Sequence, residues 1–194
     1  PHGLVPGADL EGWLDSLLEG TPLARSVSVT SLAPLIDSSN ATPLSWQAIV
    51  DDLRAHAAAD PQTAFVILHG TDTMAYTSAA LSYALTDLSV PVVITGSQLP
   101  LGELGSDAAA NVTGALKAAT SGRLSGVALF FGHRLLAGNR VTKSSSWAFT
   151  GFESPNAAPL ATTGAPWQWA PSTRGGAGWK DAAPYARHDV VVVD

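Results

Sequence analysis

Apolar runs alternate with stretches of helical periodicity along most of the chain. Four short runs have the composition of buried strands, and they are Val27–Thr30, Ala64–Leu68, Val92–Thr95 and Val127–Phe131. Ala64–Leu68 is continuous and does not alternate with polar residues, a pattern typical of a strand that is covered on both faces. The four runs therefore predict the strands of a sheet with a buried centre.

Three amphipathic stretches lie between these runs, and each has apolar residues at the i, i+3, i+4, i+7 spacing of a helix that buries one face. The first helix is expected to begin at Thr42-Pro43, with the threonine as N-cap and the proline at the first helical position. The third has Ser106 or Asp107 as its expected cap. The apolar positions of the three helices are Trp46, Ile49, Val50 and Leu53; Leu81, Ala84, Leu85 and Leu88; and Val112, Ala115, Leu116 and Ala119. Strands joined through helices predict an α/β fold, with a parallel sheet flanked by helices on both faces.

The pattern changes after residue 163. Residues 164–189 begin with a stretch rich in Gly, Pro, Ala and Trp that has no clear period, and they are interpreted as a linker. Val190–Val193 is a new apolar strand, which we interpret as the start of a second, smaller domain over residues 190–194. Residues 1–163 would form the first domain. The chain opens without a methionine or an opening strand, so we expect it to be part of a longer protein.

Composition and charge exclude several classes of function. The net charge is −6 and no Lys/Arg cluster offsets it, which argues against nucleic-acid binding. The chain has no Cys, so disulfides, thiolate zinc sites and cysteine nucleophiles are excluded. Its five His lack a metal-ligand spacing, and no metal is expected. No apolar run approaches the roughly 20 residues of a membrane span.

Ligands of such folds bind outside the carboxyl ends of the strands, so the loops after residues 30, 68, 95 and 131 are the candidate walls of a site. After the second run, Gly70 permits a tight exit, and Thr71 and Asp72 follow at a helix start. They could cap the helix and complement its dipole, or they could face the crevice and bind or activate a substrate. His69 is expected to have a structural role at the strand end.

Three other segments could contribute to the same crevice. Lys143 follows the fourth run and is either an ordinary solvated lysine or, if desolvated, a base. Asp37-Ser38-Ser39-Asn40 is either a turn or a polar clamp for a small zwitterion. Thr95–Pro100 forms a third wall, in which Gly96 allows close backbone approach. No G-x-G-x-x-G or Walker A pattern occurs, which argues against nucleotide binding.

The segment from His69 to Thr77, HGTDTMAYT, resembles the second signature of bacterial-type L-asparaginases. Further segments agree in the same order, and the similarity runs from about residue 27 to 160. Asp37-Ser38-Ser39 with Thr42-Pro43 is similar to the cytosolic, type I branch. The other matching segments are Pro91–Pro100 continuing to Ser106, Asp107 and Asn111, Val141–Lys143, and Phe152–Asn156.

The resemblance implies hydrolysis of L-asparagine to L-aspartate and ammonia, with L-glutaminase side activity, by a threonine nucleophile assisted by a Thr-Lys-Asp triad. The matching catalytic residues are Thr71, Asp72 and Lys143, and the matching substrate-binding residues are Asp37, Ser38, Ser39, Thr71 and Asp72. It implies no metal or organic cofactor, a cytoplasmic location, and a homodimer or dimer of dimers. In the family, a neighbouring subunit's carboxy-terminal domain completes the active site.

One departure from the family leaves alternatives open. The first signature, Thr-Gly-Gly-Thr-Ile, does not occur in this sequence, so the primary nucleophilic threonine and the mobile-loop tyrosine cannot be assigned. A non-catalytic amino-acid-binding domain and an amidase component of a tRNA-dependent amidotransferase are the alternatives to an asparaginase. The sequence upstream of Pro1 would discriminate between the catalytic and the non-catalytic hypotheses.

Overall fold

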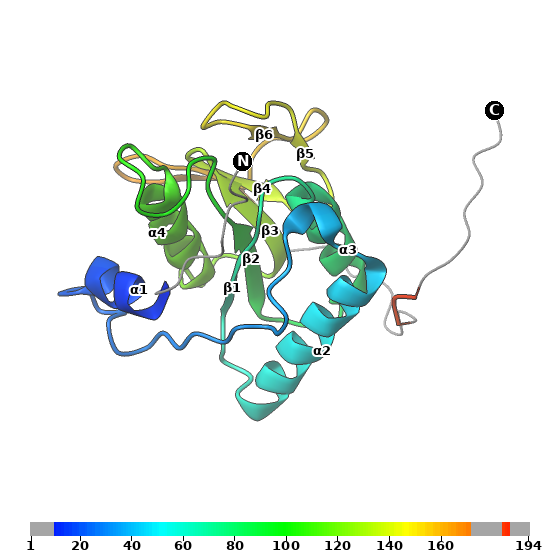
Figure 1. Cartoon of the computed structure of the whole chain (residues 1–194). Helices are drawn as coiled ribbons and strands as arrows, with labels where there is room; N and C mark the ends of the chain where they lie inside the picture. The colour runs from blue at the N-terminus through cyan, green and yellow to red at the C-terminus, as the bar shows by residue number, and fades with distance from the viewer. Residues whose placement is uncertain (1–9, 172–183, 187–194) are drawn as a thin grey trace, which may run out of the picture.

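The structure is a computed structural model of the chain, and it describes residues 10–171 and 184–186. Its centre is a six-stranded sheet with the strand order β1-β2-β3-β4-β7-β8. Helices lie on both sides of this sheet, and a small β5–β6 sheet lies beyond one end (Figure 1). The helices are α1 (Leu10–Leu18), the 3-10 turn η1 (Ser38–Asn40), α2 (Pro43–Ala59), α3 (Met74–Ala84) and α4 (Ala108–Ala119). The strands are β1 (Phe65–Leu68), β2 (Pro91–Thr95), β3 (Gly126–Phe131), β4 (Arg134–Ala137), β5 (Thr142–Lys143), β6 (Phe152–Glu153), β7 (Ala161–Thr162) and β8 (Gln168–Trp169).

The first three strands are parallel, as the sequence predicts, and the rest of the sheet corrects the expectation of a wholly parallel arrangement. β1 pairs with β2 and β2 with β3 in parallel, whereas β4, β7 and β8 are added antiparallel. Only Gly132 and His133 separate β3 from β4, and both have positive φ angles, of 53° and 71°. A two-residue connection can close a hairpin but is far too short for a crossover, so the sheet is mixed.

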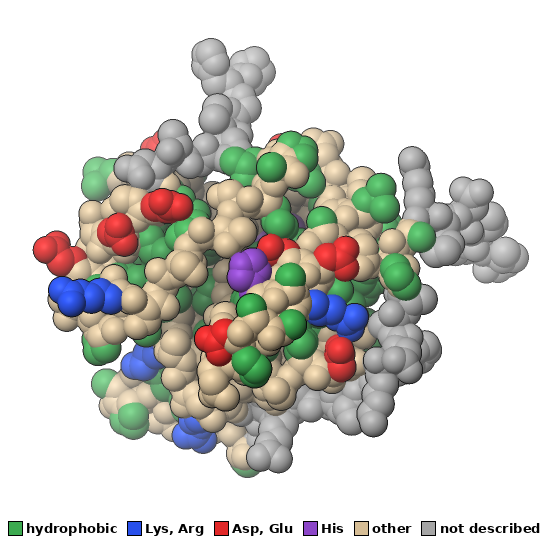
Figure 2. Space-filling view, turned by 90° about the horizontal axis from the view of Figure 1, so that it is seen from below, with side chains coloured by type: hydrophobic (Ala, Val, Ile, Leu, Met, Phe, Trp, Pro, Cys, Tyr) green, Lys and Arg blue, Asp and Glu red, His purple; other side chains and the backbone are tan. Residues whose placement is uncertain are grey.

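The two faces of the sheet are covered by different helices. Along β2, Val92 and Ile94 pack into the core cluster shared with α2 and α3, while Val93 packs into the cluster shared with α4. This alternation follows from the two-residue period of a strand and confirms that helices flank both faces. On the face shown in Figure 2, the Lys and Arg side chains of the described residues do not gather into one basic patch.

The expected first strand and the expected burial of β1 are corrected. Among the residues that the structure describes, Val27–Thr30 has no ladder partner; instead Val27 and Val29 pack against the cluster formed by α1 and α4. The β-branched composition was a correct signal for an extended, partly buried segment but not for pairing. β1 contacts helices on both faces but is only half-buried, and Leu68 is 41% exposed. Among the described residues β1 pairs with a neighbour on one side only.

Capping residues predict the helix boundaries better than the spacing of apolar residues does. α2 begins at Pro43, with a capping box formed by Thr42 and Ser45. α3 ends at Ala84, so the expected stripe runs past its end at Leu88. α4 has Asp107 at its N-cap, but that side chain makes no capping hydrogen bond.

Part of the segment interpreted as a linker belongs to the sheet. Gln168–Trp169 forms β8, and Trp167 stacks on Phe130 at a centroid distance of 5.6 Å. Tyr185 packs against the α2–α3 cluster, where its hydroxyl donates to the carbonyl of Ala80 at 2.6 Å. Val190–Val193 lies outside the described residues, so the expected second domain and the division of the chain stay predictions. Within 10–171 and 184–186, no helix is long and apolar enough to cross a membrane.

Candidate functional site

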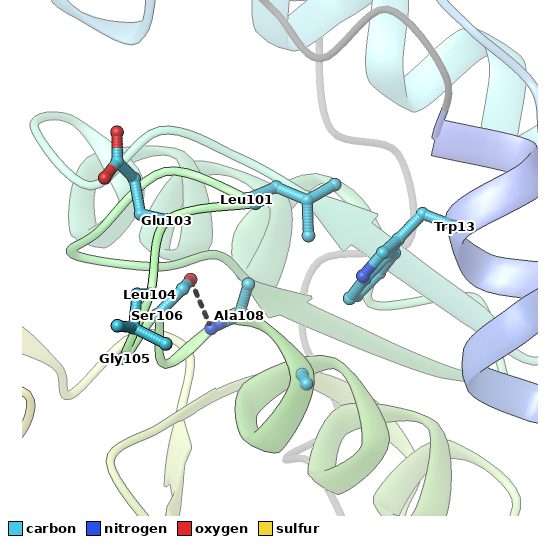
Figure 3. A pocket seen from close by; sticks show the side chains of 9 residues that line it. Trp13, Leu101, Glu103, Leu104, Gly105, Ser106 and Ala108 are labelled. Carbon is cyan, nitrogen blue, oxygen red and sulfur yellow. Dashed lines mark hydrogen bonds between the residues drawn. The ribbon is translucent and has the colours of Figure 1, made fainter.

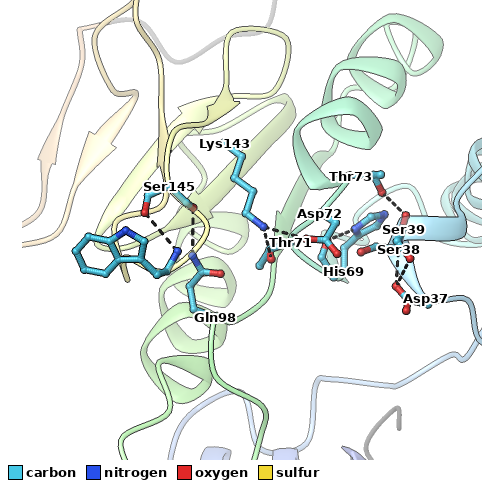
Figure 4. A network of polar contacts seen from close by, with 12 residues as sticks. Asp37, Ser38, Ser39, His69, Thr71, Asp72, Thr73, Gln98, Lys143 and Ser145 are labelled. Carbon is cyan, nitrogen blue, oxygen red and sulfur yellow. Dashed lines mark hydrogen bonds and ion pairs between the residues drawn. The ribbon is translucent and has the colours of Figure 1, made fainter. Parts of the chain in front are cut away.

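Loops far apart in the sequence meet at the carboxyl end of β1. The 69–73 loop leaves β1, the 37–40 loop lies beside it, and the β5–β6 hairpin carries Lys143 to it from the other side (Figure 4). The sequence predicts that these loops converge there. The site is built where the hydrogen bonds of the parallel strands end and the chain must turn.

The amine of Lys143 contacts both predicted partners. Its Nζ donates to Thr71 Oγ1 at 2.9 Å and to Asp72 Oδ1 at 3.0 Å. The Lys143 side chain is 20% exposed, whereas that of Asp72 is 62% exposed. An ion pair with one partner this exposed contributes only about 0–1 kcal/mol to stability. The arrangement is better suited to chemistry: a hydroxyl lies beside an amine that, when neutral, can accept its proton, and a carboxylate faces solvent beside them.

The lysine is held in place by the packing of its hairpin. Lys143 on β5 is paired with Phe152 on β6. Phe152 is fully buried, and its ring lies 4.9 Å from that of Phe131 at the end of β3. The two-stranded β5–β6 sheet is therefore anchored in the main core, which fixes the backbone from which Lys143 reaches toward Thr71.

The 37–40 loop combines a turn with a buried serine. Asp37 accepts hydrogen bonds from the backbone N–H and the hydroxyl of Ser39, both at 3.0 Å, and these bonds lower the pKa of its carboxyl. Ser38 is buried, and its carbonyl accepts a hydrogen bond from Thr73 Oγ1 at 2.7 Å. The turn interpretation is therefore correct for Asp37, and it is compatible with a binding role for the two serines.

His69 ties the base of the 69–73 loop to α3. Its Nδ1 lies 2.7 Å from the carbonyl of Gly70, and its Nε2 lies 3.0 Å from Thr77 Oγ1, which also accepts a hydrogen bond from Trp46 Nε1. These partners assign the proton to Nδ1. Burial lowers the pKa of His69, although the hydrogen bond to Gly70 opposes the shift. The contacts agree with the structural role expected for this residue.

A polar network that the sequence did not predict holds the 95–100 loop, the expected third wall. The carboxylate of Asp107 accepts hydrogen bonds from the backbone N–H groups of Gln98 and Leu99 instead of capping α4. Gln98 Nε2 in turn donates to the carbonyls of Ala148 at 3.0 Å and Ser145 at 3.4 Å, in the β5–β6 hairpin. The only signal in the sequence was the presence of a polar residue, Gln98, in the 95–100 loop. These hydrogen bonds join the 95–100 loop to the β5–β6 hairpin that carries Lys143.

Gly96 has the close backbone approach expected of it, because a Cβ there would overlap the carbonyl of His69.

A hollow of about 380 Å³ lies elsewhere, between Trp13 of α1 and the turn that precedes α4 (Figure 3). None of the predicted site residues lines it. Within the described part of the chain, no group of three or more His, Cys, Asp or Glu could hold a metal ion.

Comparison with known proteins places this chain in a family. Residues 3–173 match the protein family described as "Asparaginase, N-terminal". L-asparaginase 1 of Escherichia coli K12 is 49% identical over 143 residues, which are 74% of this chain and 42% of that protein. The 60 kDa lysophospholipase of Mus musculus is 44% identical over 138 residues, 71% of this chain and 24% of that protein. The chain therefore spans less than half the length of these relatives.

Solved structures agree with the sequence comparison. The crystal structure of L-asparaginase I from Vibrio cholerae is similar with a TM-score of 0.79 and 38% identity, and the match covers 98% of this chain and 55% of that one. The mixed sheet with helices on both faces is the arrangement that the two chains share. The match of 171 residues to one family, together with this structural similarity, shows that the chain belongs to the asparaginase family, whose N-terminal domain it carries.

Proposed function

We propose that the protein to which this chain contributes is an L-asparaginase, which hydrolyses L-asparagine to L-aspartate and ammonia and accepts L-glutamine less well. The observation that carries the proposal is the contact of Lys143 Nζ with Thr71 Oγ1 at 2.9 Å, with Asp72 beside both. Membership of the asparaginase family supports the same reaction.

Thr71, Lys143 and Asp72 would act as one unit in the cleavage. A neutral Lys143 amine can accept the proton of the Thr71 hydroxyl while that hydroxyl takes a proton from the attacking oxygen. The attacking oxygen forms a bond to the amide carbon, the carbon–nitrogen bond breaks, and the amine returns the proton to the departing ammonia. Water then hydrolyses the resulting ester and releases L-aspartate. The Asp72 carboxylate stabilises the charged lysine and, at 62% exposure, is accessible to a substrate ammonium. The primary threonine nucleophile is expected from the family resemblance and has no match in this sequence.

The 37–40 loop would hold the other end of the substrate. The hydroxyl of Ser38 is suited to an α-carboxylate, and that of Ser39 would turn from Asp37 to join it. The Asp37 side chain would still keep the turn closed through its bond from the Ser39 N–H. Asp72 would pair with the α-ammonium. The substrate amide would then point toward Thr71 and Lys143, the only part of the site with a paired hydroxyl and amine among these residues.

The remaining features of the proposal concern the complete protein. It would be a cytoplasmic homodimer or dimer of dimers, and a second, smaller domain would follow this one. A small amino acid would be its only substrate class, with no metal or organic cofactor. The dimer is functionally relevant because a neighbouring subunit would complete each site.

The test is ammonia release from L-asparagine and L-glutamine by the complete protein and its Thr71→Val variant. We expect release from asparagine, slower release from glutamine, and a large loss of turnover in the variant. Calorimetric binding of L-aspartate without any ammonia release would instead indicate a non-catalytic binding domain. Release only in the presence of a second, different protein subunit would indicate an amidotransferase component.

A further inference from the structure

Thr73 forms an unusual hydrogen bond for a residue in its position. It is the N-cap of α3, yet its side chain makes no capping hydrogen bond to that helix. A threonine N-cap ordinarily accepts a hydrogen bond from the first turn of its own helix. Here Thr73 Oγ1 donates at 2.7 Å to the carbonyl of Ser38, 35 residues away in the sequence. The hydroxyl therefore joins the 69–73 loop to the 37–40 loop.

Gly70 lets the same two loops, 69–73 and 37–40, lie close together. A Cβ on Gly70 would overlap Ser38 Oγ and lie 2.8 Å from Ser38 Cβ. Its φ angle is not among the positive ones, so it is space and not backbone conformation that requires glycine here. The space between Gly70 and Ser38 is thus too small for a methyl group, so the two loops lie close together, and the Thr73 hydrogen bond opposes their separation.

We propose that Thr73 is a positioning residue that selects asparagine over glutamine by fixing the distance between Ser38 and Thr71. The inference rests on the proposed function, in which the 37–40 loop holds the α-carboxylate and Thr71 faces the amide. Thr73 touches no reacting atom and acts through Ser38. Because Thr71 and Thr73 belong to one short loop, the hydrogen bond to Ser38 links the two ends of the substrate site directly.

The direction of the effect follows from the geometry. Glutamine has one methylene more than asparagine between its α-carbon and its amide. A pocket distinguishes substrates that differ by one methylene by roughly 10- to 200-fold. Loss of the Thr73 hydroxyl removes the hydrogen bond that holds the loops together, and the narrow space at Gly70 leaves little room for closer approach, so the loops should separate. The variant should therefore disfavour the shorter substrate and favour the longer one.

The experiment compares Thr73→Val, Thr73→Ser and Thr113→Val with the unchanged complete protein. Valine has the shape of threonine without the hydroxyl, and serine restores the hydroxyl. Thr113 is a matched control, because its exposed hydroxyl donates within its own helix to the carbonyl of Ala109 at 2.7 Å. The measurement is kcat/KM for L-asparagine and for L-glutamine, with a thermal unfolding curve for each variant.

We expect Thr73→Val to lower the ratio of the two kcat/KM values about tenfold, chiefly through a higher KM for asparagine. Thr73→Ser and Thr113→Val should keep the ratio of the unchanged protein. Gly70→Ala, which also forces the loops apart, should shift the ratio in the same direction. An equal loss with both substrates, or a ratio within twofold of the unchanged protein, would overturn the role of Thr73 alone. Absence of amide hydrolysis by the unchanged protein would overturn the proposed function and this inference with it.

Discussion

Replacement of Lys143 by methionine separates a catalytic role from a structural one. Methionine keeps most of the length of the side chain but loses the amine, and with it the contacts to Thr71 and Asp72. The ion pair that is lost is worth about 0–1 kcal/mol of folding free energy, since Asp72 is 62% exposed. A general base contributes about 10²–10⁴-fold to turnover, which corresponds to roughly 2.7–5.4 kcal/mol of transition-state free energy. The expected loss in catalysis is therefore several times the loss in stability.

Lys117→Met is the matched control for this experiment. Lys117 lies 5.2 Å from the ring centroid of Trp167, and such a cation–π contact at an exposed site contributes about 0.5–1 kcal/mol. The two variants should thus lose similar amounts of stability in urea unfolding. Ammonia release under saturating asparagine should fall at least about 100-fold in Lys143→Met and stay near normal in Lys117→Met. A kcat within twofold of the unchanged protein in Lys143→Met would refute the assignment of Lys143 to the chemistry.

Three further predictions concern other parts of the site. Asp72→Asn should lower kcat/KM for asparagine about 10- to 150-fold, because a charge-assisted hydrogen bond to the substrate ammonium is worth roughly 1.5–3 kcal/mol; an unchanged kcat/KM would reduce Asp72 to a helix-start residue. The contribution of His69 to the free energy of unfolding should not depend on pH above the ordinary histidine pKa of 6.5. Below that pH the free energy of unfolding should fall, because the unfolded state binds a proton to His69 more readily than the folded state, in which burial lowers the His69 pKa. Urea titrations at pH 7.5 and 5 would measure this fall, and a His69→Gln variant that loses as much stability as the unchanged protein would exclude His69 as its source. Gln98→Met should speed amide hydrogen exchange in residues 144–151 severalfold, since two hydrogen bonds to that turn are lost; exchange at the unchanged rate would show that the turn is held without Gln98.

Local signals in the sequence predicted the starts of α2 and α4 and the parallel strands. The cap of α3 is Thr73 and not Thr71, α1 was not predicted, and the pairing of distant segments could not be read from local signals. Thr42 and Pro43 located the start of α2 because capping depends only on neighbouring residues. Val27–Thr30 has the composition of a strand, but whether an extended segment pairs depends on a partner that composition does not identify. The β3–β4 hairpin had a usable signal in Gly132, whose freedom to adopt positive φ is typical of a tight turn.

The site shows the same division between local and long-range information. The contact between Thr71 and Lys143 joins residues 72 positions apart, and it was predicted from the family resemblance, not from spacing. The hydrogen bonds of Thr73 and Gln98 were not predicted, because each ends on a backbone carbonyl. Every residue carries such a carbonyl, so no side chain in the sequence marks the acceptor.

The tail of the chain determines where a recombinant fragment could be cut. Trp167 and Trp169 pack on the α4 side of the sheet, and Tyr185 packs on the α2–α3 side. A fragment ending at residue 163 would lose β8 and the contacts of Tyr185 with the Trp46 ring and the Ala80 carbonyl. A stop codon after residue 186 retains all of these contacts, so it is the sounder boundary for producing this unit.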